Sequence, residues 1–271
     1  MKHNANSTVL AMEEGSDSLA LVARNIEVSF GHIRVIEGLN LEIARNRTVG
    51  LVGESGSGKS TLGKAIVGIN RIRTGQIEVF GRDISRISRR ERRDLSRVVQ
   101  YIPQDPYSSL SPRRTIGQTL AEALDPQWAR TTVDQDKVKE TLHSVGLDMD
   151  VLPKFPHQFS GGQRQRIAIA RTLLLEPQLI IADEVTSALD VSVQKEIIQL
   201  LKGLKQSLSL TMLFISHNLA VVEDLCDDVV VMQRGTIMER GSVTKVFQSP
   251  ESPYTQSLLA SVPGAPGFAL E

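Results

Sequence analysis

One short stretch, residues 53–60, has the residue types best suited to chemistry: three glycines among polar residues, then a lysine and a serine. Its pattern, G-x-x-x-x-G-K-S, is that of a P-loop, whose glycines let backbone N–H groups turn inward around phosphates. Lys59 is expected to reach the β- and γ-phosphates of a nucleotide, and the Ser60 hydroxyl to bind Mg²⁺. A flexible glycine/serine turn is the alternative. We favour the P-loop because residues 49–52 are predicted to be a buried strand and residues 61–67 a helix, as phosphate binding requires.

Two carboxylates, Asp183 and Glu184, follow directly after the apolar residues 179–182. A strand buried on both faces of a parallel sheet has this continuous apolar sequence. With a P-loop in the same chain, Asp183 is expected to hold Mg²⁺ as a Walker B acid. Glu184 would accept a proton from the attacking water or orient it. Without the P-loop, an acidic turn after a strand would be the simpler interpretation.

Ser160 and Gln163 stand in the S-x-x-Q relation of a capping box, which predicts that a helix begins after Ser160. Gly161 and Gly162 in its first turn each cost about 1 kcal/mol relative to alanine, so a plain cap does not explain them. Their missing side chains would let bare amides approach an anion closely. This pattern predicts a second phosphate-directed surface, which need not serve the same copy of the nucleotide.

Four apolar, strand-like runs each end in a group that could act on a phosphate. These groups are the P-loop from Gly53, the amide of Gln104, the acids Asp183 and Glu184, and the imidazole of His217. In open α/β sheets, ligands bind outside the carboxyl ends of the strands. We therefore expect the four runs to deliver these groups to one edge of a sheet. A lone histidine is more often structural, but its place after a strand favours a role for His217 at this edge.

The segments around these runs predict two further parts of the fold. Residues 21–30, 33–36 and 39–43 are predicted to be strands of an antiparallel layer before the P-loop. Phe30 could stack on an adenine ring, although spacing alone favours a core residue. After proline-rich punctuation, residues 116–124 and 133–145 are mostly helical by pattern, which predicts an inserted helical subdomain.

Whole-chain composition is that of an ordinary globular protein. Lys plus Arg and Asp plus Glu both total 31 in 271 residues, so the net charge is zero and exerts no general attraction on nucleic acid or anionic lipid. Residues 86–97 interleave arginines with acids and contain no aromatics, which favours a solvated helix over a nucleic-acid surface. Cys226, the only cysteine, excludes an internal disulfide, and its apolar neighbours predict a packed thiol rather than a reactive one.

Membrane and export signals are not evident in the sequence. No apolar run approaches the roughly 18 to 20 residues needed to span a bilayer. The N-terminal residues include acids soon after a very short apolar patch, which does not resemble a secretion signal. We therefore expect a cytosolic protein unless a partner holds it at a membrane.

Together these residues resemble the nucleotide-binding subunit of an ABC transporter, and the resemblance covers nearly the whole chain after the N-terminal tail. It implies an α/β fold: a P-loop NTPase (RecA-like) core with an N-terminal antiparallel β layer and an inserted α-helical subdomain. The implied ABC ATPase domain is residues 19–248, with the helical subdomain at about 105–175. Residues 1–18 would be a mobile tail, and residues 249–271 a short C-terminal extension.

The resemblance also assigns roles residue by residue. The family's Q-loop falls on Gln104, its LSGGQ signature on residues 159–163, its D-loop on residues 187–190 and its switch histidine on His217. Two subunits are implied to meet head to tail around two ATPs. The residues implied to bind ATP on one copy are Phe30, Gly53, Ser55, Gly56, Gly58, Lys59, Ser60, Thr61 and Asp190. Those implied to contact the partner's ATP are Ser160, Gly161, Gly162 and Gln163. The implied Mg²⁺ ligands are Ser60, Gln104 and Asp183, and the implied catalytic residues are Glu184, His217, Gln104 and Lys59.

Four positions depart from the family's pattern, and none removes a phosphate, metal or proton-handling group. They are Phe159 for the usual Leu, Val185 for Pro, Pro103 for Phe and Asn218 for Asp. The subgroup resembles the ATPases of oligopeptide, dipeptide and nickel importers. Residues 104–113, QDPYSSLSPR, are similar to their QDPYSSLNPR stretch, and residues 249–259 to their C-terminal HPYT-x-x-LL element. Residues 53–63 are similar to the second (F-type) of the two ATPases such importers usually carry.

By this resemblance, the chain hydrolyses ATP as a peripheral subunit at the cytoplasmic face of the inner membrane. The implied partners are a second ABC ATPase, different or identical, two membrane permease subunits and an extracytoplasmic substrate-binding protein, with no nucleic acid. Peptides are the first expected substrate, and nickel chelates, opines or other small solutes are alternatives. A soluble ABC ATPase of translation or DNA repair is a further alternative. Such proteins usually have tandem cassettes or a long coiled-coil insertion, and this sequence shows neither. A non-hydrolysing regulatory cassette is disfavoured by Glu184 and His217.

Overall fold

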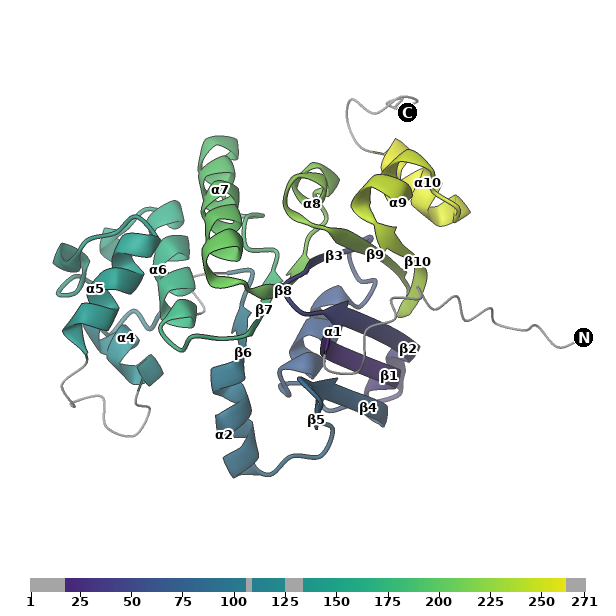
Figure 1. Ribbon diagram of the computed structural model, residues 1–271, viewed down its shortest axis with the longest axis horizontal. Coiled ribbons are helices and arrows are strands. Elements are labelled where there is room, and N and C mark those ends of the chain that lie inside the picture. Colours follow the sequence, from purple (N-terminus) through teal and green to yellow (C-terminus); the bar gives the residue numbers. More distant parts are fainter. Residues whose placement is uncertain (1–17, 106–108, 125–133, 262–271) are drawn as a thin grey trace, which may run out of the picture.

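Residues 18–105, 109–124 and 134–261 are described by the computed structural model, which is drawn in Figure 1. The predicted tail over residues 1–18 falls almost wholly outside these ranges. So do the end of the C-terminal extension and residues 106–108 of the importer-like stretch. The limits predicted for the domain, the helical subdomain and the extension stay predictions.

An antiparallel sheet occupies the N-terminal part of the fold. Its order is β2 (Ile33–Ala44), β1 (Leu19–Phe30), β4 (Thr74–Val79) and β5 (Arg82–Asp83). Buried and exposed residues alternate along β2, as in a sheet with one covered face. The prediction of two strands at 33–36 and 39–43 is wrong. The strand β2 is continuous, because a β-bulge within it at residues 37–38, opposite Glu27 of β1, absorbs the irregularity in its pairing with β1.

A second sheet carries the predicted phosphate-directed groups. Its order is β10 (Thr236–Ser242), β9 (Asp228–Gln233), β3 (Thr48–Val52), β8 (Thr211–Ile215), β7 (Leu179–Asp183) and β6 (Val99–Ile102). Neighbouring strands are parallel, except that β10 is antiparallel to β9. Every residue of β3, β7 and β8 is buried, which explains their continuous apolar sequences. The four strands that precede the P-loop, Gln104, Asp183–Glu184 and His217 therefore end at one edge, as predicted.

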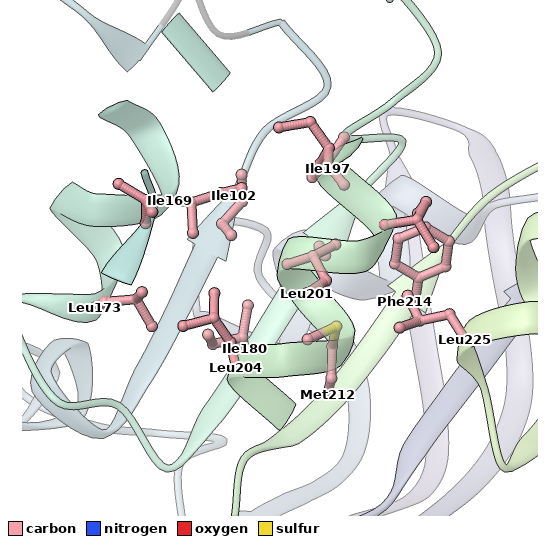
Figure 2. Close-up of a cluster of buried hydrophobic side chains, with 14 of the residues drawn as sticks. Ile102, Ile169, Leu173, Ile180, Ile197, Leu201, Leu204, Met212, Phe214 and Leu225 are labelled. Carbon is pink, nitrogen blue, oxygen red and sulfur yellow. The ribbon is translucent and has the colours of Figure 1, made fainter. Parts of the chain in front are cut away.

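Two apolar layers hold this parallel sheet. On one face, strand residues such as Ile180 and Met212 pack with Leu201 and Leu204 of α7 (Val191–Leu208), as Figure 2 shows. On the other face, a separate cluster joins the strands to α1 (Lys59–Ile66) and to the antiparallel sheet. Alternate residues of each strand enter opposite layers. The strand ends therefore form a rigid support for a site.

The remaining helices surround the two sheets. Those in the described ranges are α2 (Arg89–Val98), α4 (Ile116–Leu124), α5 (Gln135–Ser144), α6 (Gly161–Leu173), α8 (Leu219–Leu225), α9 (Val243–Gln248) and α10 (Pro253–Ala260). Short 3₁₀ helices lie at Met149–Val151 and Pro156–Gln158. The helices α4, α5 and α6 pack together on the side opposite α9 and α10 (Figure 1). This grouping agrees with the prediction of helices at 116–124 and 133–145.

Helix ends follow local sequence signals. Ser88 and Glu91 form a capping box that starts the arginine-rich helix α2. Asp134 caps α5 by accepting from two backbone N–H groups. Within the described ranges, no helix combines the length and the apolar character that crossing a membrane would take.

Candidate nucleotide-binding site

The P-loop lies between the end of β3 at Val52 and the start of α1 at Lys59. Gly53 has φ +147°, and a Cβ on it would lie 2.0 Å from the carbonyl oxygen of Met232 in β9. No side chain fits there, so the loop requires glycine at this position. Ser55 and Gly56 are exposed, whereas Gly58 is buried at the N-terminus of α1. The exposed bend and the helix N-terminus together form a surface suited to an anion.

Lys59 is folded back over this loop. Its Nζ donates to the carbonyl oxygens of Gly53 and Glu54, at 2.8 Å each. Burial lowers the pKa of Lys59, while the carboxylates of Glu184 and Asp183 act in the opposite direction. The ammonium group is therefore bonded to the P-loop and lies in the electrostatic field of two acids.

Asp183 connects the end of β7 to the first turn of α1. The residue is 2% exposed, and its Oδ1 accepts a hydrogen bond from Ser60 Oγ at 3.0 Å. Its Oδ2 accepts from the hydroxyl of Tyr101 on β6. Both carboxylate oxygens are thus satisfied despite burial.

The donor set around Asp183 fits Mg²⁺. A hydroxyl and a carboxylate are oxygen ligands of the kind that Mg²⁺ takes when phosphates and water complete its octahedron. Within the described ranges, no group of three or more His, Cys, Asp or Glu side chains is placed to hold a metal ion. An all-protein cage is not needed for this cation at a phosphate site. Ser60 and Asp183 are the residues that would hold it.

Glu184 follows Asp183 in the chain, and two more of the predicted residues contact its carboxylate. Gln104 Nε2 donates to its Oε2 at 2.8 Å, and His217 Nδ1 lies 3.4 Å from its Oε1. Gln104 also contacts Ser187 Oγ at 3.4 Å. Three strand ends therefore meet at one carboxylate. The amide nitrogen of Gln104 faces Glu184, so its predicted role as a Mg²⁺ ligand stays a prediction.

Phe30 is not a core residue. It is 52% exposed at the end of β1, so the interpretation that spacing alone favoured is wrong. An exposed ring can stack on a base, and that role stays a prediction. Asp190 is exposed at the N-cap position of α7, and Thr61 is half-buried in α1.

The predicted capping box at Ser160 is confirmed. Gln163 N–H donates to Ser160 Oγ at 3.3 Å, and Ser160 N–H donates to Gln163 Oε1 at 3.0 Å. The two glycines between them differ. A Cβ on Gly162 would lie 2.4 Å from Cγ1 of Val193 in α7, whereas Gly161 is exposed. Close packing of α6 on α7 therefore explains why residue 162 is a glycine.

Several contacts at the site were not found from the sequence. Tyr101 donates to Asp183, Ser187 accepts from Gln104, and the hydroxyl of Tyr254 in α10 accepts from Glu54 N–H at 3.2 Å. Each depends on which elements are neighbours in space. The sequence signal that could have indicated Tyr101 is its place in the strand-like residues 98–102, three positions before Gln104.

Cys226 is buried, as predicted. It follows α8, and burial is the main cause that raises the pKa of its thiol. Its neighbour Asp227 accepts from Lys205 Nζ and from the backbone N–H of Thr48. The thiol therefore belongs to the packing of α8 against β3 and not to the site.

Comparison with known proteins places this geometry in a family. The model of the ABC transporter family matches residues 36–187. A putative peptide import ATP-binding protein of Brucella ovis is 46% identical over 243 residues, which cover 89% of this chain and 77% of that protein. The oligopeptide transport ATP-binding protein OppF of Salmonella typhimurium is 43% identical over 234 residues, which cover 85% of this chain and 70% of that protein.

Solved structures agree in fold. The cbiO1 protein of Clostridium perfringens, described as part of the ABC transporter complex cbiONQ, matches with a TM-score of 0.76 and 27% identity, over 86% of this chain and 92% of that chain. The ATP-binding cassette MJ0796, in a dimeric post-hydrolysis state bound to ADP and Pi, matches with a TM-score of 0.73 and 25% identity, over 82% and 98%. With a phosphate loop, two acids, an amide and an imidazole at one sheet edge, the chain belongs to the ABC transporter family and has the fold of its ATPase subunit.

Proposed function

We propose that this chain hydrolyses ATP to power peptide import, as a peripheral subunit at the cytoplasmic face of the inner membrane. One observation carries the catalytic part: the carboxylate of Glu184 lies between Gln104 Nε2 and His217 Nδ1, beside the acid Asp183 and the P-loop. Hydrolysis of a phosphoanhydride needs positioning and charge stabilisation at one point, which this convergence supplies.

The reaction begins with ATP on the exposed bend of the P-loop, with Phe30 stacked on the adenine. Lys59 turns from the carbonyls of Gly53 and Glu54 toward the β- and γ-phosphates. Mg²⁺ bound at Ser60 and Asp183 would supply charge neutralisation for the phosphate oxygens. These contacts hold the γ-phosphate beside the edge where Glu184 lies.

Glu184 then orients a water molecule in line with the bond to be broken. The water oxygen forms a bond to the γ-phosphorus, its proton passes to the Glu184 carboxylate, and ADP leaves with the electrons of the broken P–O bond. Gln104 holds Glu184 by its hydrogen bond, and His217 contacts the γ-phosphate. Each of these residues comes from a different strand end, so the site depends on the whole sheet.

A second ATPase subunit completes each site in the proposed assembly. Ser160, Gly161 and Gln163 are exposed at the start of α6, and Asp190 is exposed at the start of α7. An exposed helix N-terminus with free amides suits a phosphate on another copy. The dimeric MJ0796 cassette supports a two-subunit arrangement. The partner is a second ABC ATPase, different or identical.

Peptides are the proposed substrate class because the two relatives named above are described as ATP-binding proteins of peptide import and of oligopeptide transport. The other partners are two permease subunits and an extracytoplasmic substrate-binding protein. These proposals go further than the membership of the chain in the ABC transporter family.

Reconstitution tests this function. The chain is purified with its permease and ATPase partners, placed in liposomes, and assayed for phosphate release with a substrate-binding protein loaded with short peptides or with a nickel chelate. We expect peptide-loaded protein to stimulate hydrolysis more than empty protein does. Stimulation by the nickel chelate alone would contradict the substrate class, and absence of ATP hydrolysis would contradict the enzymatic role.

A further inference from the structure

Tyr101 is brought to the magnesium pocket by the register of two strands. In the parallel pairing of β6 with β7, Tyr101 lies opposite Ile181. Side chains two residues apart on a strand share a face, so Asp183 projects from the same face as Ile181. That face is covered by α1, because Ile181 packs with residues of this helix. An aromatic side chain at position 101 can therefore reach diagonally to Asp183.

The contact made there is specific. The hydroxyl of Tyr101 donates to Asp183 Oδ2, while Oδ1 of the same carboxylate accepts from Ser60 Oγ at 3.0 Å. A carboxylate oxygen can only accept, and the phenol hydroxyl of a tyrosine carries its proton at neutral pH, so Tyr101 is the donor in this bond. The two oxygens of Asp183 are thus held by groups from two different elements.

The helix α1 packs closely on the strands beside the Tyr101 ring. A Cβ on Gly63 of α1 would lie 2.9 Å from Cδ1 of Ile215 and 3.0 Å from Cγ2 of Ile181. The same Cβ would lie 3.6 Å from Cε2 of Tyr101. The helix can approach the strands this closely only because residue 63 has no side chain. The half-buried Tyr101 ring therefore lies against α1, on the face of the sheet that carries Asp183.

We propose that Tyr101 is a positioning residue for the magnesium site, which keeps the Asp183 carboxylate oriented toward the metal through its hydrogen bond to Oδ2. This inference rests on the proposed roles of Ser60 and Asp183 and goes beyond them. The last torsion of an aspartate side chain is broad, so a carboxylate held at one oxygen only can rotate. Partners that hold a metal-binding side chain typically contribute 10–100-fold to metal affinity.

The test replaces Tyr101→Phe, which keeps the ring and removes the hydroxyl. A non-hydrolysable ATP analogue is titrated into the purified full chain by calorimetry, once with Mg²⁺ and once with EDTA. We expect the Mg²⁺-dependent gain in affinity to fall about 10-fold, with affinity in EDTA unchanged. Mn²⁺ binding followed by electron paramagnetic resonance should weaken by a similar factor. Neither measurement depends on turnover.

Tyr254→Phe is the matched control. It also removes one tyrosine hydroxyl at the P-loop, but that hydroxyl accepts from Glu54 N–H, whereas the hydroxyl of Tyr101 donates to Asp183. Any effect of this control should change affinity with Mg²⁺ and with EDTA by the same factor. If Tyr101→Phe behaves in this way, or leaves both affinities as in the wild type, the positioning role is overturned. Failure of the wild-type chain to bind the analogue at all would overturn the proposed function instead.

Discussion

At the scale of single residues, Glu184 has a backbone conformation that most side chains avoid. Its φ is 47°, in the left-handed region, which costs a non-glycine residue about 1–3 kcal/mol when the surrounding structure enforces it. Its N–H donates to the carbonyl of Ile215 in β8 at 2.9 Å, and its carbonyl accepts from Ser187 N–H. These bonds hold the turn and aim the carboxylate at Gln104 and His217. Strain that is retained at a site of this kind is consistent with a catalytic role.

Replacing Glu184→Gln should separate binding from chemistry. The amide keeps the size of the side chain but cannot accept a proton, and general-base catalysis typically contributes 10²–10⁴-fold. We expect turnover in the assembled complex, measured by phosphate release, to fall by about that factor while ATP still binds and holds the two subunits closed. Glu223→Gln, at an exposed position in α8, is the control. Turnover close to wild type in Glu184→Gln would exclude Glu184 as the base.

At the scale of elements, the packing of α6 on α7 decides where the signature residues lie. Gly162 is buried against Val193 near the start of α7, while Ser160 and Gly161 remain exposed. The contact fixes the direction of α6, and with it the direction in which its first amides point. Gly162 therefore serves packing, while Gly161 stays exposed at the start of α6.

Gly162→Ala should destabilise the chain. The added methyl group would overlap Val193, and overpacking of a filled interior typically costs about 1–3 kcal/mol. Urea denaturation of the purified chain measures this loss in the free energy of unfolding. A second change, Val193→Ala, should recover part of the loss because it makes room for the methyl group.

Gly161→Ala is the matched comparison. Its Cβ would lie 3.4 Å from Cδ2 of Leu189, an ordinary contact, and alanine is the better helix former by about 1 kcal/mol. We expect stability to be unchanged or slightly raised. Equal destabilisation by Gly161→Ala and Gly162→Ala would show that packing on Val193 is not the reason for the second glycine.

At the scale of the whole molecule, the parallel sheet is held between two apolar layers, so distant segments share one cooperative interior. Three distant segments, α7, α8 and β3, meet near Cys226. This cysteine follows α8, and a Cβ on Gly50 of β3 would lie 3.2 Å from its Sγ. Lys205 of α7 forms an ion pair with the adjacent Asp227. A thiol in such a position is accessible only when the sheet and its helices separate.

The buried thiol of Cys226 should couple stability to pH. Its pKa is raised in the folded state, so well below the unfolded value of about 8.5 the thiol is protonated in both states and burying it lowers stability by no ionisation cost. As pH rises further, the unfolded chain loses this proton and the folded chain does not. Stability should then fall by up to about 1.4 kcal/mol per pH unit.

Urea denaturation between pH 7.5 and 9.5, compared with Cys226→Ala, isolates this contribution. We expect the wild type to lose stability relative to the variant over this range. A maleimide should also react with the native wild-type chain only as fast as the chain unfolds. Rapid labelling of the native chain, or identical pH dependence of the two proteins, would contradict the assignment of a packed thiol.

The sequence alone determined the features that depend on neighbours along the chain. The P-loop pattern, the capping box at Ser160 and the apolar runs before Gln104, Asp183 and His217 are local signals, because backbone geometry and strand burial act over a few residues. They were sufficient to predict the strand edge at which the site lies. Between residues 36 and 39 the strand pattern is interrupted, so the sequence predicted two strands there. Pairing with β1 makes them one strand.

The tertiary structure alone decided which side chains meet. The hydrogen bond from Gln104 to Glu184 and the one from Tyr101 to Asp183 join residues about 80 positions apart in the chain. Such contacts depend on strand order, on register and on how closely α1 approaches the sheet. The exposure of Phe30 and the burial of Gly162 against Val193 were decided in the same way. Residue type and spacing along the chain do not predict these contacts and exposures, because the contacts and exposures arise from the packing of whole elements against one another.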